Sequence, residues 1–417
     1  MSTASRAETV TRWSVAIVGF AIIFLDRFDT ALLPLLLPTL SPLWQLAPKS
    51  FGIALTITNI GAVFGFFVSG WLVSRFGLKR VLIVGCIWFG VWTLAAALIL
   101  HLQSMSLLAA VRLMTGFGLG VVVPTAIGLA TQHAARRHQA VIAVLVTLGL
   151  GTGAAACGFL GGSLVRAFGP NGSFLFGGIL PLIIAAIGYL VLPAHVELTA
   201  QAPQAQNRYE AMVARLLERG YRGTTILLWV FSFSIFIAYY TLSNWIPSLL
   251  IGFGFGPTEA PLGLGFFSIG AVLGGLALFV LVRMVDVRPL LLIMCAISTV
   301  FIVLVGKADT ASRLLLLLYL AGAGFGIVAA QIGQLTLAVL YYPAGMRTTG
   351  VGWAAAMGRC GSIIGPAVGG LLLAAGLDGQ SIVLTMLVPM LLASAISAVL
   401  WSLDSQVKEE DVLTVPN

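Results

Sequence analysis

The sequence predicts an all-α integral membrane protein with twelve transmembrane helices in two six-helix halves. Of 417 residues 59% are hydrophobic and 9% charged, with mean hydropathy +1.06, whereas soluble proteins carry about 25% charged residues. Twelve apolar runs are long enough to cross a bilayer. A shift of 208 positions lays matching residues of the two halves on one another. Composition therefore excludes a soluble protein, and the repeat predicts two similar halves.

Hydropathy places each span between short polar connections. The longest polar interval, Pro193–Gly223, predicts a linker with a short amphipathic helix over Tyr209–Glu218. It separates an N-terminal half, 1–192, from a C-terminal half, 224–403, and the polar tail 404–417 is expected to be disordered. The spans are expected at about 13–37, 51–73, 81–100, 107–131, 140–166, 174–192, 224–251, 260–282, 289–306, 312–340, 348–375 and 380–402.

Basic residues indicate the orientation of the spans. With a cytoplasmic N-terminus, fifteen Lys and Arg fall in cytoplasmic segments and four on the opposite side. This bias predicts that both termini are cytoplasmic. The net charge of +8 does not predict nucleic-acid binding, because the basic residues are spread over these connections and form no single patch.

The internal repeat is visible in three separate regions. The shift of 208 lays Arg75 on Arg283 and Arg80 on Arg288, and it lays Gly116-Phe117-Gly118 on Gly324-Phe325-Gly326. It also aligns Gly153 with Gly361. An even number of spans per half makes this a parallel repeat about an axis along the membrane normal, as in transporters with a site between two six-helix halves.

The first span carries three charges, Asp26, Arg27 and Asp29, in the middle of an apolar run. A charge at the bilayer centre costs at least ~2.5–3.5 kcal/mol, so this cluster needs a functional or structural reason. The two aspartates are three positions apart and share one helix face. That face predicts either a water-filled cavity or a polar partner helix.

Several motifs resemble the major facilitator superfamily. The loop Gly70-Trp-Leu-Val-Ser-Arg-Phe-Gly-Leu-Lys-Arg80 and the fourth span, with Arg112, Gly116, Gly118, Gly120 and Pro124, are similar to its signatures. Asp26-Arg-Phe-Asp29 resembles the Asp-Gly-Phe-Asp motif of its aromatic acid:proton symporters. Ser243-Asn-Trp-Ile-Pro247 and Thr349-Gly-Val-Gly-Trp353 with Gly358-Arg359 resemble their spans seven and eleven. The resemblance implies the major facilitator fold, transport in a bacterial inner membrane and a monomer.

Three positions depart from the family pattern. Ser74 replaces an Asp of the superfamily loop, which implies the loss of a cytoplasmic-gate ion pair. Gln132 replaces a Glu of the subfamily, and Arg27 replaces the Gly of its first-span motif. These changes leave the substrate and the coupling open.

Proton coupling is expected at Asp26 and Asp29. The other twelve acidic residues and all four histidines lie in loops, span ends or tails. Burial disfavours the charged form of a carboxyl group and a neighbouring Arg favours it, so a moving neighbour can switch protonation. The hypothesis assigns the coupling proton to one aspartate, with Asp29 the first choice; the alternative is a structural ion pair with Arg27 or Arg112.

Three arginines, Arg27, Arg112 and Arg359, lie within spans and leave the interior net positive. A carboxylate accepts a bidentate guanidinium bond, which favours an anionic substrate. Arg359, near the middle of its span, is the first choice for the substrate carboxylate, with structural pairing as the alternative. For Arg112, structural bridging and binding stay equally open.

Aromatic and amide side chains could bind a phenolic ring by stacking and hydrogen bonds. Interfacial aromatics and interhelical amide bonds are the alternative explanation. The candidates are Tyr239, Tyr240, Asn244, Trp245, Gln331, Gln334, Trp353 and Thr125.

Basic and acidic residues of two connections are expected to set the membrane topology and to form the cytoplasmic gate. They are Arg75, Lys79, Arg80, Arg283, Asp286 and Arg288. No metal site or cofactor is expected, and the glycine runs lack the Lys and flanking strand of a phosphate loop. The four cysteines, Cys86, Cys157, Cys295 and Cys360, are interpreted as core residues without disulfides.

The sequence thus predicts a proton-coupled symporter that imports a small organic anion, such as an aromatic carboxylate, by alternating access. An antiporter of drugs, another carboxylate carrier and a non-transporting membrane sensor remain alternatives. An enzyme is disfavoured, because no His, Cys or Glu cluster lies within the spans.

Overall fold

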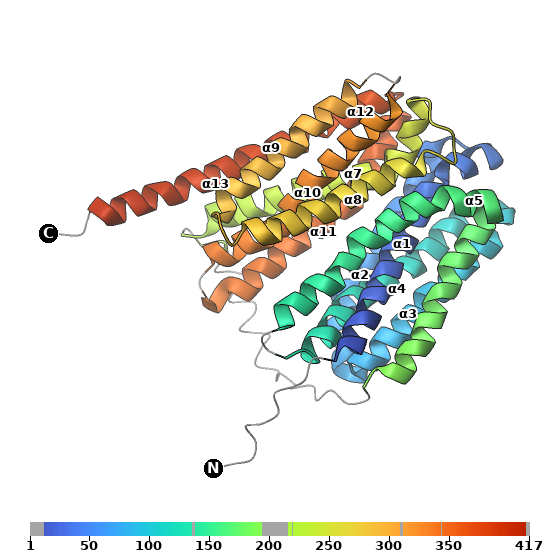
Figure 1. Ribbon diagram of the computed structural model, residues 1–417, viewed down its shortest axis with the longest axis horizontal. Helices are drawn as coiled ribbons and strands as arrows, with labels where there is room; N and C mark the ends of the chain where they lie inside the picture. The colour runs from blue at the N-terminus through green and yellow to red at the C-terminus, as the bar shows by residue number, and fades with distance from the viewer. Residues whose placement is uncertain are drawn as a thin grey trace, which may run out of the picture. The chain divides into compact units, whose positions relative to one another are not determined.

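The computed structural model describes residues 12–135, 138–193, 216–218, 220–308, 312–342 and 344–413. All regular structure within these ranges is helical (Figure 1). The helix predicted over Tyr209–Glu218 lies almost entirely outside them. Up to the linker, the helices are α1 Trp13–Leu43, η2 Pro48–Phe51, α2 Gly52–Phe76, α3 Leu78–Ile99, η3 Leu100–Leu102, α4 Met105–Gln132 and α5 Gln139–Val191.

After the linker the helices follow the predicted spans closely, except at the end of the chain. There the last span is divided at Met386, and its second part continues to Leu413. The expectation of a disordered tail from Asp404 is therefore wrong as far as Leu413. These helices are α7 Arg222–Gly252, α8 Pro261–Leu281, α9 Val287–Gly306, α10 Arg313–Tyr341, α11 Ala344–Ala374, α12 Gly379–Thr385 and α13 Leu387–Leu413.

The helices account for the twelve predicted spans. Ten stretches of the described residues are long and apolar enough to cross a membrane. One of them covers both the fifth and sixth predicted spans, because α5 runs through a kink at Gly169. Gly169 has φ +67°, a left-handed conformation that glycine adopts without steric cost. The remaining span is α1, which is long enough at 31 residues but carries the three charges.

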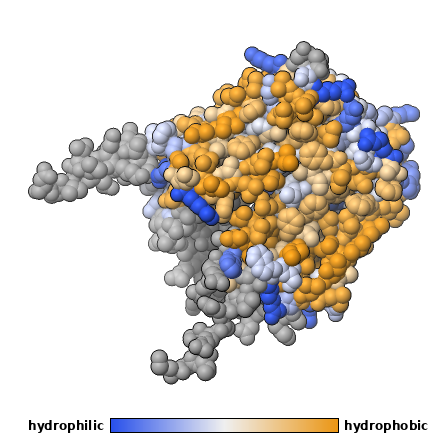
Figure 2. Space-filling view, in the orientation of Figure 1, coloured by the Kyte–Doolittle hydropathy of each residue, from blue (hydrophilic) through white to orange (hydrophobic). Residues whose placement is uncertain are grey.

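Lipid-compatible surfaces and a packed interior both follow from the apolar composition. The face of the molecule seen in Figure 2 is mainly hydrophobic, with hydrophilic residues at its borders. Inside, Ile22, Leu82, Phe89, Val122 and Val146 are fully or almost fully buried in one cluster. Of the four cysteines three are buried, whereas Cys360 is exposed, so its interpretation as a core residue is wrong.

The chain folds into two compact units. One comprises Met1–Ala200 with Asn244–Ser268, and the other comprises Gln201–Ser243 with Ile269–Asn417. The segment Asn244–Ser268 joins the first unit through close backbone packing on α5. A Cβ added to Gly158 would lie 2.1 Å from the backbone N of Gly265. Glycine is therefore required for α5 and α8 to approach this closely.

The internal repeat appears as the same helix contact in each half. A Cβ at Gly65 of α2 would lie 2.1 Å from the carbonyl O of Phe117 in α4. A Cβ at Gly274 of α8 would lie 2.1 Å from the carbonyl O of Phe325 in α10. Phe117 and Phe325 are partners under the 208-residue shift. The two halves thus use equivalent small-residue packing.

Gly120 provides a test of this packing. A Cβ there would lie 1.9 Å from the carbonyl O of Ala62, whereas a Cβ at Gly70 would meet nothing within 4 Å. We expect Gly120→Val to lower the free energy of unfolding by at least about 1–3 kcal/mol, because neither backbone can yield without separating α2 from α4. Thermal unfolding of the purified protein measures the effect. Gly70→Val is the matched control, and equal melting temperatures for the two variants would contradict the close packing.

Candidate functional site

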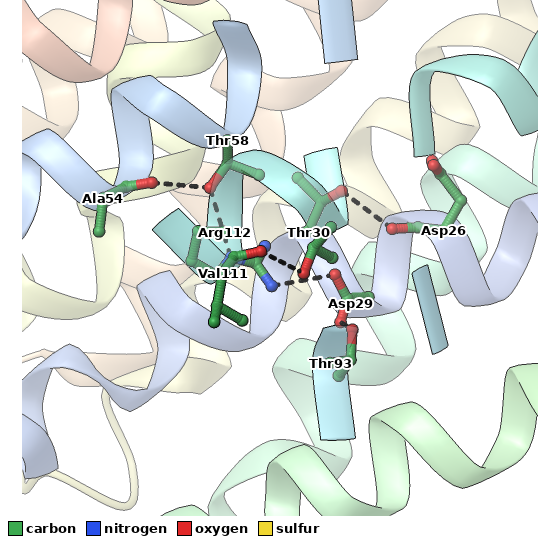
Figure 3. A network of polar contacts seen from close by, with 9 residues as sticks. Asp26, Asp29, Thr30, Ala54, Thr58, Thr93, Val111 and Arg112 are labelled. Atoms are coloured by element: carbon green, nitrogen blue, oxygen red, sulfur yellow. Dashed lines mark hydrogen bonds and ion pairs between the residues drawn. The ribbon is translucent and has the colours of Figure 1, made fainter. Parts of the chain in front are cut away.

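Asp29 of α1 meets polar side chains of α3 and α4 within the first unit, and a residue of α2 joins them through Arg112 (Figure 3). Asp29 is fully buried, and its Oδ2 lies 3.1 Å from Nη1 of Arg112 on α4. Its other oxygen, Oδ1, accepts a hydrogen bond of 2.6 Å from the hydroxyl of Thr93 on α3. Both carboxylate oxygens of Asp29 therefore have partners.

Arg112 is also fully buried, and its Nε donates to the hydroxyl of Thr58 on α2 at 3.3 Å. Thr58 in turn donates to the carbonyl O of Ala54 in its own helix. The guanidinium group is thus held between α1 and α2 with its counter-charge in contact. A buried pair of this kind is stable only as a pair, since loss of one partner leaves an uncompensated charge.

Asp26 lies one turn earlier on α1 and is 5% exposed. Figure 3 shows its side chain pointing away from the Asp29–Arg112 pair. The carbonyl O of Asp26 accepts a hydrogen bond from Thr30. Arg27 is half-buried on the same helix. The two aspartates predicted as proton-coupling groups therefore have different surroundings, and Arg112 contacts Asp29.

In the second unit, Arg359 lies on α11, fifteen residues after Ala344, near the middle of a 31-residue helix. Its side chain is half-buried. The predicted binding residues Tyr239 and Tyr240 of α7 are buried and meet edge to face, with ring centroids 5.1 Å apart. Trp353 stacks on Trp229 of α7, a residue that sequence reasoning did not single out.

The remaining binding candidates have varied surroundings. Gln334 is buried, and its side-chain oxygen accepts a hydrogen bond from Ser232, so it joins α10 to α7. Thr125 is buried and donates to the carbonyl O of Val121 in its own helix. Gln331 is half-buried, and Asn244 and Trp245 are buried in the first unit.

The predicted gate residues lie at helix ends. Lys79 at the start of α3 donates to the carbonyl O of Leu192 and lies 5.4 Å from the ring of Tyr189, which ties α3 to the end of α5. In the second unit Asp286 caps α9 and pairs with Arg288 at 3.0 Å. Arg75, Arg80 and Arg283 are exposed.

Sequence reasoning missed Thr93 and Thr58. A threonine within a membrane span gives little signal, because its hydroxyl commonly bonds to its own helix, as Thr115 and Thr125 do. Thr93 is recognised only by its contact with Asp29, 64 positions away in the sequence.

The family model of the Major Facilitator Superfamily matches residues 19–359. The chain belongs to this superfamily. It is 30% identical to the 4-hydroxybenzoate transporter PcaK of Pseudomonas aeruginosa over 412 residues, covering 92% of this chain and 91% of the relative. It is 27% identical to a gallate transporter of Pseudomonas putida, covering 99% and 96%. The protein is therefore a multi-pass membrane transporter of the superfamily, related to carriers of aromatic acids, and not an enzyme.

Among solved structures, the crystal structure of a D-xylose-proton symporter superposes with a TM-score of 0.76 at 16% identity. The match covers 93% of this chain and 97% of that one. At this identity the similarity shows the fold, and it confirms the predicted major facilitator architecture.

Proposed function

We propose that this transporter is a symporter that imports a small aromatic carboxylate, similar to benzoate or hydroxybenzoate, together with a proton. The observation that carries the proposal is the buried Asp29–Arg112 pair on α1 and α4. A carboxylate that shares its site with an arginine can hold a proton only when the arginine moves away or finds another anion. The related carriers of 4-hydroxybenzoate and gallate support an aromatic acid as that anion.

The proposed cycle uses Arg359 to bind the substrate carboxylate and a first-helix aspartate to carry the proton. Arg27, Arg112 and the aromatic and amide candidates contribute to substrate binding. When both the substrate and the proton are bound, the two halves can rearrange so that the binding site opens to the other side of the membrane. Release of the proton then weakens substrate binding. Coupling requires that the carrier changes its access when it is empty or holds both substrate and proton, and that it does not do so when it holds only one of them.

The proposal also places the protein in a bacterial inner membrane as a monomer, with both termini in the cytoplasm. Related carriers from Pseudomonas support the bacterial setting. The orientation is supported by the fifteen basic residues on one side against four on the other.

Uptake into proteoliposomes tests the proposal. We expect labelled 4-hydroxybenzoate to accumulate when the outside is more acidic, and the lumen to acidify as substrate enters. A protonophore should abolish accumulation but leave exchange of labelled for unlabelled substrate. Alkalinisation of the lumen during substrate entry would indicate an antiporter, and the absence of any flux would indicate a sensor. Either result would overturn symport.

A further inference from the structure

Two tryptophans of the second unit form a stacked pair. Trp229 of α7 and Trp353 of α11 have ring centroids 5.4 Å apart and an interplanar angle of 27°. Both side chains are half-buried. Part of each indole therefore remains accessible while the two rings cover one another.

The packing of α7 on α11 brings the pair together. Thr241 donates to the carbonyl O of Gly365 at 2.9 Å, and a Cβ at Gly361 would lie 3.2 Å from the backbone N of Ile237. Each of these contacts joins positions 124 apart, as are Trp229 and Trp353. The helices are thus parallel and in constant register. Glycines allow backbone contact in one part of the interface, and indoles face each other in another.

The indole N–H groups of this pair are buried without a hydrogen-bond partner among the described residues. By contrast, Nε1 of Trp88 on α3 donates to the carbonyl O of Met114 at 2.9 Å. A buried donor that lacks an acceptor costs free energy, so tryptophan in apolar surroundings usually finds one. Two such donors on stacked rings therefore favour a ligand that brings an acceptor.

Neighbouring polar groups do not supply that acceptor within the described part of the chain. Ser232, one turn after Trp229, has a single hydroxyl proton, and the side-chain oxygen of Gln334 and the carbonyl O of Leu228 are the two acceptors within its reach. Among the described residues, the pair itself thus presents aromatic faces and two N–H donors, which match a flat anion.

We propose that Trp229 and Trp353 form an aromatic-acid binding element, in which the substrate ring stacks on an indole and a substrate oxygen accepts an Nε1–H. This inference rests on the proposed function and assigns Trp229 to it. The donors are covered in this structure, so binding requires a tilt of the indoles about their side-chain torsions. Because the N–H groups lack acceptors beforehand, the arriving oxygen stabilises the tilted arrangement.

Tryptophan-to-phenylalanine substitutions test the proposal, because phenylalanine keeps an aromatic ring and removes the donor. We expect Trp229→Phe and Trp353→Phe each to weaken benzoate binding by about tenfold, as measured by calorimetry on the purified protein. Trp88→Phe is the matched control, since it removes an indole donor that already has an acceptor, and it should bind benzoate like the wild type. Leucine at either position should also remove the preference for benzoate over cyclohexanecarboxylate.

The outcomes separate this inference from the proposed function. If wild-type protein binds benzoate and both phenylalanine variants bind it equally well, the pair only packs the helices and the inference fails alone. Equal weakening in Trp88→Phe would also refute it. If wild-type protein binds no aromatic acid, both proposals fail. Thermal unfolding verifies that each variant folds. If one variant does not fold, quenching of tryptophan fluorescence by 4-hydroxybenzoate is measured in the other variant and decides whether the inference holds.

Discussion

Asp29→Asn is expected to abolish accumulation of the substrate against its gradient. An inward gradient of one pH unit supplies about 1.4 kcal/mol per proton, which supports about tenfold accumulation in one-to-one symport. Without a titratable group at this position the ratio should fall to about one. Exchange of labelled for unlabelled substrate needs no net proton movement, so the variant should retain it. Uptake and exchange assays in proteoliposomes made from the same protein preparation measure the accumulation ratio and the exchange rate.

Stability must be controlled in this experiment, because Asp29 is the counter-charge of the buried Arg112. Removal of one partner of a buried pair costs about 3–5 kcal/mol. The double variant Asp29→Asn with Arg112→Gln removes both charges and should recover part of this loss. Asp26→Asn is the matched control, because it removes the other carboxylate of the same helix. Accumulation that survives Asp29→Asn but is lost in Asp26→Asn would move the coupling proton to Asp26.

Arg359→Gln is expected to weaken binding of the aromatic carboxylate by about 100-fold while the protein remains folded. A hydrogen bond to a charged group contributes about 1.5–3 kcal/mol, and a bidentate guanidinium contact lies toward the upper end of that range. Benzyl alcohol, which has the same ring without the charge, should lose less than about threefold. Calorimetric titration of both ligands gives the ratio.

Arg166→Gln provides the control for loss of one positive charge. Arg166 is exposed near the end of the fifth span, and it donates to the hydroxyl of Ser163 one turn earlier. We expect unchanged affinity for both ligands in this variant. Equal affinity of wild type and Arg359→Gln for benzoate would exclude Arg359 from carboxylate binding. In that case Arg27 and Arg112 remain as the arginines within the spans that could bind the carboxylate.

Fold class and span positions follow from the sequence because insertion of an apolar helix in a bilayer depends mainly on its own composition. Most helices begin and end within a few residues of the hydropathy boundaries, but α1 continues six residues further, to Leu43, and α5 covers two predicted spans. The 208-residue repeat pairs Phe117 with Phe325, whose carbonyl groups lie against Gly65 and Gly274. The extension of α13 to Leu413 was not predicted, since a polar sequence outside the apolar run carries no hydropathy signal.

The expectation that the first span has a special role also comes from the sequence alone, because charges in a membrane helix are costly wherever they occur. Only the tertiary structure decides which groups meet them. Arg112 and Thr93 contact Asp29 from 83 and 64 positions away. The stacking of Trp229 on Trp353 likewise depends on the register of α7 and α11. Such contacts arise from how helices pack, and no local pattern of residues encodes them.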